Sequence, residues 1–74
     1  MARFHFDIHE NDRLIPDEDG RDFEDDEWAR QLALATGVSI ARDAFVGGSA
    51  NRIVIDVRKG ETRFLRVSIS LSLD

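Results

Sequence analysis

The sequence predicts an α+β fold in which an antiparallel sheet of two hairpins packs on one long helix, in the order ββαββ. Three observations support this prediction. Apolar and polar residues alternate near both ends of the chain, which is the period-two pattern of half-buried strands. The alternation is unbroken over residues 65–73. The segment from about Asp26 to Phe45 lacks it, and acidic residues before it and glycines after it are typical helix boundaries.

Size and composition limit the class of protein. A chain of 74 residues is expected to form a single domain, residues 1–74. A domain of this size buries only about 60% of its unfolded surface, so oligomerisation often contributes to stability. The absence of cysteine agrees with a reducing cytoplasm. We expect a cytoplasmic protein, because we find neither a secretion signal nor an apolar run of the roughly 18 residues that a membrane span needs.

Charge is unevenly distributed along the chain. Residues 1–37 carry eleven acidic side chains and four arginines, whereas residues 38–74 carry four acidic and six basic side chains. A net charge of −5 repels nucleic acid at long range, so nucleic-acid binding is not the expected activity. The acidic first half and the basic second half can attract each other, within one chain or between two copies.

The N-terminal segment is expected to form the first hairpin. Phe4, Phe6 and Ile8 alternate with charged residues and histidines, so one face of this strand is apolar. A short strand at 13–15 should follow and end at Pro16, which cannot donate to a ladder and suits a sheet edge. This hairpin should therefore place an aromatic face on the core.

The helix is expected to begin at the N-cap Asp25 and to end at Gly47-Gly48. Its apolar residues do not form one stripe. At about 100° per residue they fall on two sides: Trp28, Leu32 and Ala35 on one, and Leu34, Val38, Ala41 and Phe45 on the other. Gly37 stands between them and costs about 1 kcal/mol relative to alanine. Either the helix kinks at Gly37, or its two faces are buried against different structures.

The core is expected between the helix and the apolar face of the sheet. Its sheet side should consist of Phe4, Phe6, Ile8, Ile53, Ile55, Val57, Leu65, Val67 and Ile69. Its helix side should consist of Trp28, Leu32 and a subset of Leu34, Val38, Ala41 and Phe45. Trp28 is assigned to the core, with an interface as the alternative, because tryptophan is enriched at interfaces.

The second hairpin suggests where another chain could attach. A tight turn at Lys59-Gly60 would pair Arg58 with Glu61 and Arg52 with Val67. Beyond that point the last strand would overhang its partner with three apolar residues, Ile69, Leu71 and Leu73. An apolar strand edge left open promotes association with another strand.

Candidate metal ligands do not form a recognised site. His5, Asp7 and His9 share one strand face, but at about 3.3 Å per residue the two histidines stand roughly 13 Å apart, and zinc needs three or four convergent ligands. The run from Asp17 to Glu27 holds eight carboxylates in eleven positions. Aligned on its glycine, an EF-hand loop would have isoleucine at its first ligand position. We expect a solvated turn, with weak divalent-cation binding left open.

No catalytic or cofactor motif is recognisable in the chain. No serine or threonine has a histidine in a known arrangement, and Gly47-Gly48 lacks the lysine and the preceding strand of a phosphate loop. The protein is therefore expected to be neither an enzyme nor a cofactor binder.

The leading hypothesis is a small non-enzymatic module that forms a homodimer or binds a protein partner. Its contact residues would be Leu34, Val38, Phe45, Ile69, Leu71 and Leu73. The alternative is an RNA-binding sheet in which basic side chains neutralise phosphates and one outward-facing aromatic residue stacks on a base. Its residues would be Arg58, Arg63, Phe64 and Arg66. A membrane partner is not expected.

The opening residues, Arg3-Phe-His-Phe-Asp-Ile8, resemble an aromatic-x-Phe-Asp-Ile/Val signature. The resemblance extends to Asp19-Gly20, the helix start at Asp25, the alanines from Ala29 onward and Ala41-Arg-Asp-Ala44. Together these residues are similar to a family of small bacterial proteins, frequent in rhizobia and their relatives, that is catalogued as a domain of unknown function. The chain departs from it at Thr36-Gly37, where the family has better helix formers. The resemblance implies no activity, cofactor or catalytic residue.

Overall fold

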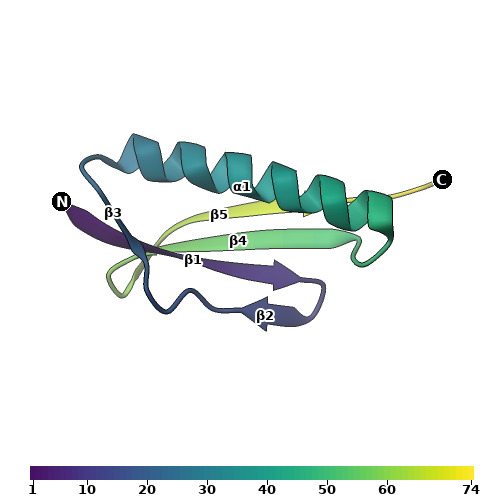
Figure 1. The fold of residues 1–74 in the computed structure, drawn as a ribbon, viewed down its shortest axis with the longest axis horizontal. Helices are drawn as coiled ribbons and strands as arrows, with labels where there is room; N and C mark the ends of the chain where they lie inside the picture. The colour runs from purple at the N-terminus through teal and green to yellow at the C-terminus, as the bar shows by residue number, and fades with distance from the viewer.

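One helix lies across one face of a five-stranded antiparallel sheet (Figure 1). The computed structural model describes all residues from Met1 to Asp74. The elements in chain order are β1 (Ala2–Glu10), β2 (Arg13–Ile15), β3 (Arg21–Phe23), α1 (Asp26–Gly47), β4 (Arg52–Lys59) and β5 (Thr62–Ser70). The predicted α+β class and the ββαββ order with its hairpins are confirmed, and β3 is a short additional strand.

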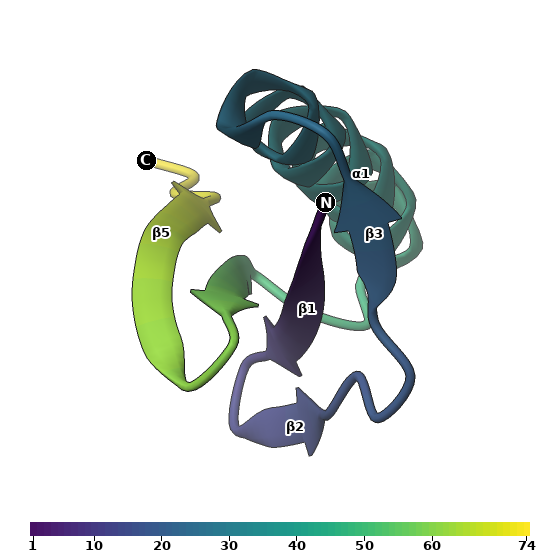
Figure 2. The same cartoon turned by 90° about the vertical axis from the view of Figure 1, so that its left-hand side faces the viewer.

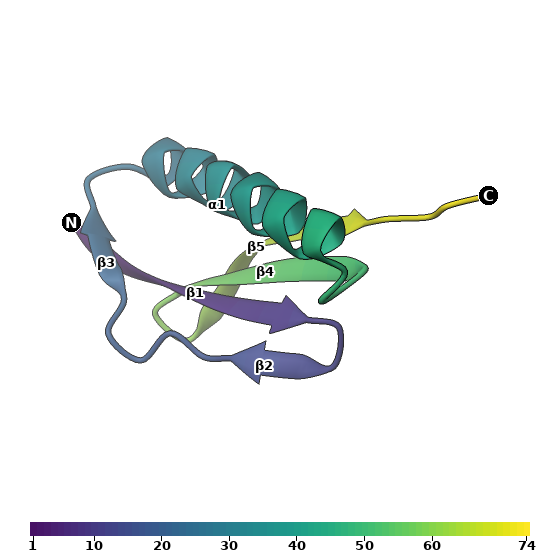
Figure 3. The same ribbon diagram turned by 45° about the vertical axis from the view of Figure 1, so that its right-hand side comes forward.

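The sheet has the strand order β2-β1-β4-β5, and β3 pairs with the beginning of β1. Strands β1 and β4 are distant in sequence but lie side by side at the centre, as Figures 2 and 3 show. Their register runs from Phe4 opposite Lys59 to Glu10 opposite Ile53. The two edges of the sheet are therefore β5 on one side and the β2 and β3 segments on the other.

Asp17 fills the gap that separates β2 from β3 along β1. The N–H of Phe6 donates to Asp17 Oδ2 at 3.0 Å, and the N–H of Gly20 donates to Asp17 Oδ1 at 3.0 Å. The N–H of Asp17 in turn donates to Asp7 Oδ1 at 2.9 Å. One carboxylate thus takes the place of a strand partner for the middle of β1.

The ends of the helix agree with the predicted boundaries. Asp25 is the N-cap, and its Oδ1 accepts a hydrogen bond from the N–H of Trp28 at 3.0 Å. At the other end the N–H of Gly48 donates to the carbonyl oxygen of Ala44. The helix runs without interruption through Gly37, so both groups of apolar residues belong to one continuous helix.

Helix α1 contacts the sheet through its smallest residues. The buried positions of the helix are Ala29, Ala33, Gly37, Ala41 and Ala44. A Cβ atom placed on Gly37 would lie 3.4 Å from Ile69 Cδ1 and 3.5 Å from Ile55 Cγ1, so the helix backbone runs close above β4 and β5. Gly37 is therefore a contact position and not a break in the helix.

The predicted helix side of the core is wrong for Trp28 and holds for only some of the other predicted residues. Trp28 and Val38 are each 61% exposed, and Leu34 is 39% exposed. Of the predicted set, Ala41 is buried, while Leu32 and Phe45 are only partly buried beside the core. The prediction assumed that large apolar residues mark the buried face. In the structure the alanines face the sheet and the large side chains lie on the two flanks of the helix.

The sheet side of the core is confirmed. Phe4, Ile53, Ile55 and Val57 are fully buried, and Phe6 is 9% exposed. The other predicted residues are partly buried and pack against this cluster: Ile8, Leu65, Val67 and Ile69. The alternation in the strands therefore predicts correctly which side chains turn toward the helix.

The register of the second hairpin differs from the prediction. Lys59 pairs with Thr62, which moves the turn one residue along the chain to Gly60-Glu61. Arg52 pairs with Ser70 instead of Val67. Strand β5 consequently ends level with the start of β4, and the predicted apolar overhang reduces to the four residues after Ser70.

A β-bulge in β5 accounts for part of this shift. Arg58 pairs with Arg63 and Val57 pairs with Leu65, so Phe64 is an extra residue without a partner. The bulge allows both Phe64 and Leu65 to turn toward the core, where both pack against the buried cluster. Phe64 was expected on the outer face, and that expectation is wrong.

Candidate functional site: an open strand edge and its helix flank

The two edges of the sheet differ in how well they are protected. Strand β2 has three residues and is followed by Pro16, and β3 also has three residues. Strand β5 has nine residues without proline, and no element pairs with its outer side. Edge strands pair with other chains unless short length, proline or charge prevents it. Strand β5 is therefore the open edge of this fold.

The hydrogen-bond pattern shows which backbone groups of β5 are free. The N–H of Leu71 donates to the carbonyl oxygen of Asn51 at 2.9 Å. In an antiparallel ladder the bonds to one neighbour involve every second residue. The backbone groups of Arg66, Ser68 and Ser70 therefore point away from β4, toward the open edge.

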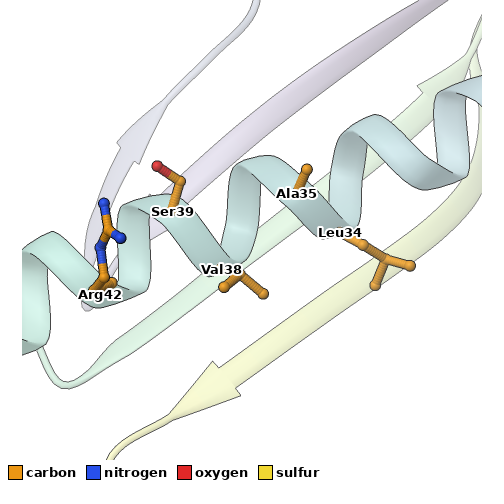
Figure 4. Close-up of a pocket in the computed structure, with 5 residues that line it drawn as sticks. All are labelled: Leu34, Ala35, Val38, Ser39 and Arg42. Atoms are coloured by element: carbon orange, nitrogen blue, oxygen red, sulfur yellow. The ribbon is translucent and has the colours of Figure 1, made fainter.

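The flank of α1 that carries Leu34 and Val38 is apolar and exposed. Together with Ala35, Ser39 and Arg42 these residues line an open hollow of about 500 Å³ on the helix surface (Figure 4). In Figure 4 the side chains of Leu34 and Val38 project on the side of the helix along which β5 runs, while Ala35 and Ser39 project away from it.

The opposite flank of the helix confirms this assignment of sides. Leu32 and Thr36 line a different hollow together with Phe6 of β1 and Ile15 of β2. Both strands lie on the side of β4 that faces away from β5. The flank with Leu34 and Val38 therefore lies above the open edge.

The six predicted contact residues fall into two groups. Leu34, Val38, Leu71 and Leu73 are exposed, whereas Phe45 and Ile69 are partly buried against the core. Leu34 and Val38 lie above the open edge, and Leu71 follows it directly. The prediction placed an open strand edge beyond Val67 but named only apolar side chains as its contact residues, so Ser68 and Ser70 were not among them. The small, uncharged residues at these positions were the available signal.

The outer face of the sheet carries two bidentate ion pairs. Arg58 Nε lies 2.7 Å from Asp7 Oδ2, and Arg66 Nε lies 2.7 Å from Asp56 Oδ1. The second nitrogen of each guanidinium reaches the other carboxylate oxygen, at 3.3 Å and 3.2 Å. Hydrogen bonding to Arg58 holds the pKa of Asp7 below its ordinary value, and Arg66 does the same for the pKa of Asp56.

This face does not match the arrangement expected of an RNA-binding sheet. Arg58 and Arg66 are already paired with carboxylates, and Arg63 alone of the three predicted arginines makes no ion pair. The ring of Phe64 packs edge-to-face on Phe4, with ring centroids 5.5 Å apart, so it lies on the core side of the sheet and not on the face that carries Arg58 and Arg66. No structural observation favours this alternative.

The histidines and the acidic run have separate partners. His5 Nδ1 lies 2.9 Å from the carbonyl oxygen of Asp17, which only accepts, so this nitrogen is the donor. His9 Nε2 lies 3.2 Å from Asp56 Oδ2. Three carboxylates of the run form ion pairs: Asp22 with Arg3, Asp26 with Lys59 and Glu27 with Arg30. No three potential ligands converge on a common point.

The fold and its surface define a small α+β domain in which one long helix covers a sheet and one strand edge stays open. The chain belongs to the family described as Domain of unknown function (DUF6894), whose model matches residues 3–70. The predicted membership in a family of unknown function is thus confirmed. No curated protein and no solved structure matches the chain. Helix α1 does not have the combination of length and apolar character that crossing a membrane requires.

Proposed function

We propose that this protein is a non-enzymatic interaction module that acts as a cytoplasmic homodimer, joined by antiparallel pairing of β5 with β5 of a second copy. The observation that supports it is the nine-residue open edge of β5, which contains no proline. The exposed apolar flank of α1 lies directly above that edge. A chain without cysteine needs no oxidising compartment for this role.

A two-fold axis at Ser68 satisfies the free backbone groups. Ser68 would face Ser68 of the second copy, and Arg66 would face Ser70 on each side of the axis. These three pairs exchange about six hydrogen bonds. No like charges face each other directly, and each Arg66 is already neutralised by Asp56. The edge is therefore complementary to itself.

The same register continues the apolar face of the sheet across the axis. Val67 would face Ile69 of the second copy, and Leu65 would face Leu71. All four side chains retain some contact with water in the single chain. Pairing removes part of that apolar surface from water, at about 25 cal/mol per Å². The core would thus extend through both copies.

The helices would also meet at this axis. The Cβ position of Gly37 lies 3.4 Å from Ile69 Cδ1 and 3.5 Å from Val67 Cγ1, so α1 crosses β5 at the level of Ser68. Leu34 and Val38 flank Gly37 on the side of the open edge. Two helices placed in this way would approach within the roughly 8–10 Å of ordinary helix packing. Their exposed apolar side chains would cover one another.

Sedimentation at micromolar concentration tests the proposal, with Ser68→Pro and Ser68→Ala as a matched pair. Proline removes an N–H that points to the open edge and leaves the ladder between β4 and β5 intact. We expect a dimer for the unmodified chain and for Ser68→Ala, and a folded monomer for Ser68→Pro. A monomeric unmodified chain at about 100 µM, equivalent to a dimerisation free energy weaker than about 5.5 kcal/mol, overturns the proposal.

A second matched pair tests the helix contact. Val38→Glu places a charge at the proposed axis, whereas Ser39→Glu places the same charge on the side that faces away from β5. We expect Val38→Glu to weaken dimerisation at least about ten-fold, a loss of about 1.4 kcal/mol. Ser39→Glu should leave it unchanged. Equal effects of the two substitutions would show that Val38 does not lie at the interface.

A further inference from the structure

A second apolar surface lies on the flank of α1 opposite the proposed dimer axis. Two hollows of about 400 Å³ and 330 Å³ both include Arg21 and Leu32 in their linings, so they adjoin each other, and together they are called the groove here. This groove runs between α1 and the side of the sheet formed by β1, β2 and β3. Its apolar lining comes from Phe6, Ile8, Ile15, Phe23, Trp28 and Leu32.

Trp28 forms one end of this groove and leaves most of its indole exposed. Phe23 lies beside it, and its ring packs edge-to-face on Phe4 and Phe6, with ring centroids 5.8 Å and 6.2 Å away. The aromatic wall of the groove is therefore fixed by the core, while Trp28 stays accessible. An exposed tryptophan at the border of an apolar hollow is typical of a residue that anchors a binding partner.

Two carboxylates, Asp17 and Asp22, line the groove. Residues 17–27, which supply part of its lining, contain eight acidic side chains and one basic side chain, Arg21. Glu18, Asp19 and Glu24 are acidic residues of this run that form no ion pair. An apolar groove with an excess of negative charge around it attracts and retains cationic partners.

We infer that this groove docks a segment of another protein that carries large apolar side chains flanked by lysine or arginine. The apolar side chains would enter between Trp28 and Phe6, and the basic ones would meet the carboxylates of residues 17–27. The groove stays open in the proposed dimer, because it lies on the opposite flank of α1 from Val38. Each copy would therefore offer one such groove, and the inference holds for a monomer as well.

The protein itself does not supply a segment of this kind. Ion pairs within the chain already hold Arg3, Arg30, Arg42, Arg58, Lys59 and Arg66. The remaining basic residues are isolated: Arg13, Arg21, Arg52 and Arg63. Strand β2 alone places a free basic residue, Arg13, beside exposed large apolar ones, Leu14 and Ile15. It carries a single positive charge, pairs with β1 and itself supplies Ile15 to the groove lining, so the occupant is a different chain.

The fluorescence of Trp28 provides a direct test, because it is the only tryptophan in the chain. The probes are two synthetic peptides of about twelve residues without tryptophan, one amphipathic with leucine and lysine and one with glutamate in place of lysine. We expect the leucine–lysine peptide to shift the emission of Trp28 to shorter wavelength in a saturable titration that weakens as salt is added. The glutamate peptide should produce no shift.

A pair of variants separates the groove from general attraction between opposite charges. Thr36→Lys places a positive charge on the groove wall, and Ser39→Lys places the same charge on the helix surface outside the groove. We expect Thr36→Lys to weaken binding at least about ten-fold and Ser39→Lys to change it less than two-fold, since net charge alters equally in both. Far-ultraviolet circular dichroism checks that both variants fold.

A substitution of an exposed residue that is expected to strengthen binding provides a control, because misfolding would weaken binding. Arg21→Glu removes the one basic side chain from the groove lining and should strengthen binding of the leucine–lysine peptide several-fold. The inference is overturned if the two peptides bind equally. It is also overturned if Thr36→Lys and Ser39→Lys weaken binding to the same extent, or if Trp28 emission does not respond.

Discussion

Arg58 binds Asp7 across β1 and β4, although His5, and not Asp7, stands directly opposite Arg58 in the sheet. The guanidinium reaches diagonally to the neighbouring position, where Nε lies 2.7 Å from Asp7 Oδ2. The same carboxylate accepts the N–H of Asp17 at 2.9 Å. One side chain thus joins both central strands to the loop that fills the gap beside β1.

Replacing this carboxylate should destabilise the fold. We expect Asp7→Asn to lower the free energy of unfolding by about 1–2 kcal/mol, because it removes a charge-assisted pair in a half-buried position. Urea denaturation measures the change. Asp43→Asn is the control, because Asp43 lies 3.7 Å from Arg42 and both are 76% exposed, and it should cost less than about 0.5 kcal/mol. Equal losses for both variants would contradict this role of Asp7.

Acid should also destabilise the protein, through three carboxylates of the sheet and its loop. The pKa of Asp7 is lowered chiefly by its hydrogen bond with Arg58, and the pKa of Asp56 chiefly by Arg66. Partial burial alone would raise the pKa of Asp17, but the N–H groups of Gly20 and Phe6 that bond its carboxylate outweigh burial and lower it. All three groups therefore bind fewer protons in the folded chain than in the unfolded chain near the ordinary value of 3.8.

The direction of the pH effect follows from these lowered values. The stabilisation is fully present above about pH 5 and declines as the pH falls through 3.8 toward the folded pKa values. We expect urea midpoints to be constant between about pH 5 and 7 and to decrease steeply below about pH 4. The decrease should be shallower in Asp7→Asn, which lacks one of the three groups. A stability that stays flat down to about pH 2.5 would rule out this linkage.

Gly37 offers a substitution that should stabilise the protein. A Cβ atom there would lie 3.4 Å from Ile69 Cδ1 and 3.5 Å from Ile55 Cγ1, which are ordinary contact distances. We expect Gly37→Ala to raise the free energy of unfolding by about 0.5–1 kcal/mol through its higher helix propensity. Gly37→Leu should instead lower it by about 1–3 kcal/mol, because no space is left for a longer side chain. Thermal and urea denaturation of both variants would show the two opposite signs.

Gly20 and Gly60 allow a comparison of two glycine-to-alanine substitutions, one at a crowded position and one at an open position. Both have positive φ angles, 74° and 64°. A Cβ atom on Gly20 would lie 2.8 Å from the carbonyl oxygen of Phe4, whereas one on Gly60 would meet nothing within 4 Å. We expect Gly60→Ala to cost about 1 kcal/mol for its backbone conformation alone. Gly20→Ala should cost at least about 1 kcal/mol more, because the backbone of β1 must also move.

These predictions concern features that the sequence reveals to different degrees. Strand positions and their buried faces were predictable, because alternation fixes both at once, as Phe6 and Ile55 show. The start of the helix was predictable as well, since an N-cap such as Asp25 acts within four residues of itself. Local periodicity and local capping are both read from neighbouring residues.

Contacts between distant residues were not predictable in the same way. The buried face of α1 was misplaced, because the alanines and Gly37 that form it carry little hydrophobic signal of their own. The bulge at Phe64 depends on how β5 fits the core beside Phe4. The residues next to Phe64 in the sequence give no signal of a bulge. The partnership of Asp17 with the N–H of Phe6 joins residues eleven positions apart through a turn of irregular shape.

The candidate site was predictable only in part, for a related reason. Leu34 and Val38 were predicted as contact residues because the helix has two apolar faces, and both are exposed in the structure. The open backbone of Ser68 and Ser70 was missed, because which residues of a strand point outward depends on the register. That register moved by several residues with the turn and the bulge.

The alanine face of α1 has a consequence for how this kind of chain can diversify. Residues that the sheet requires and residues that are proposed to contact other molecules occupy separate positions around the helix. Leu34 and Val38 on one flank, and Trp28 on the other, are free to change without leaving a void in the interior. Related chains could therefore acquire new partners through flank substitutions while Ala33 and Gly37 keep the same architecture. In this scaffold, binding specificity and foldability can evolve independently.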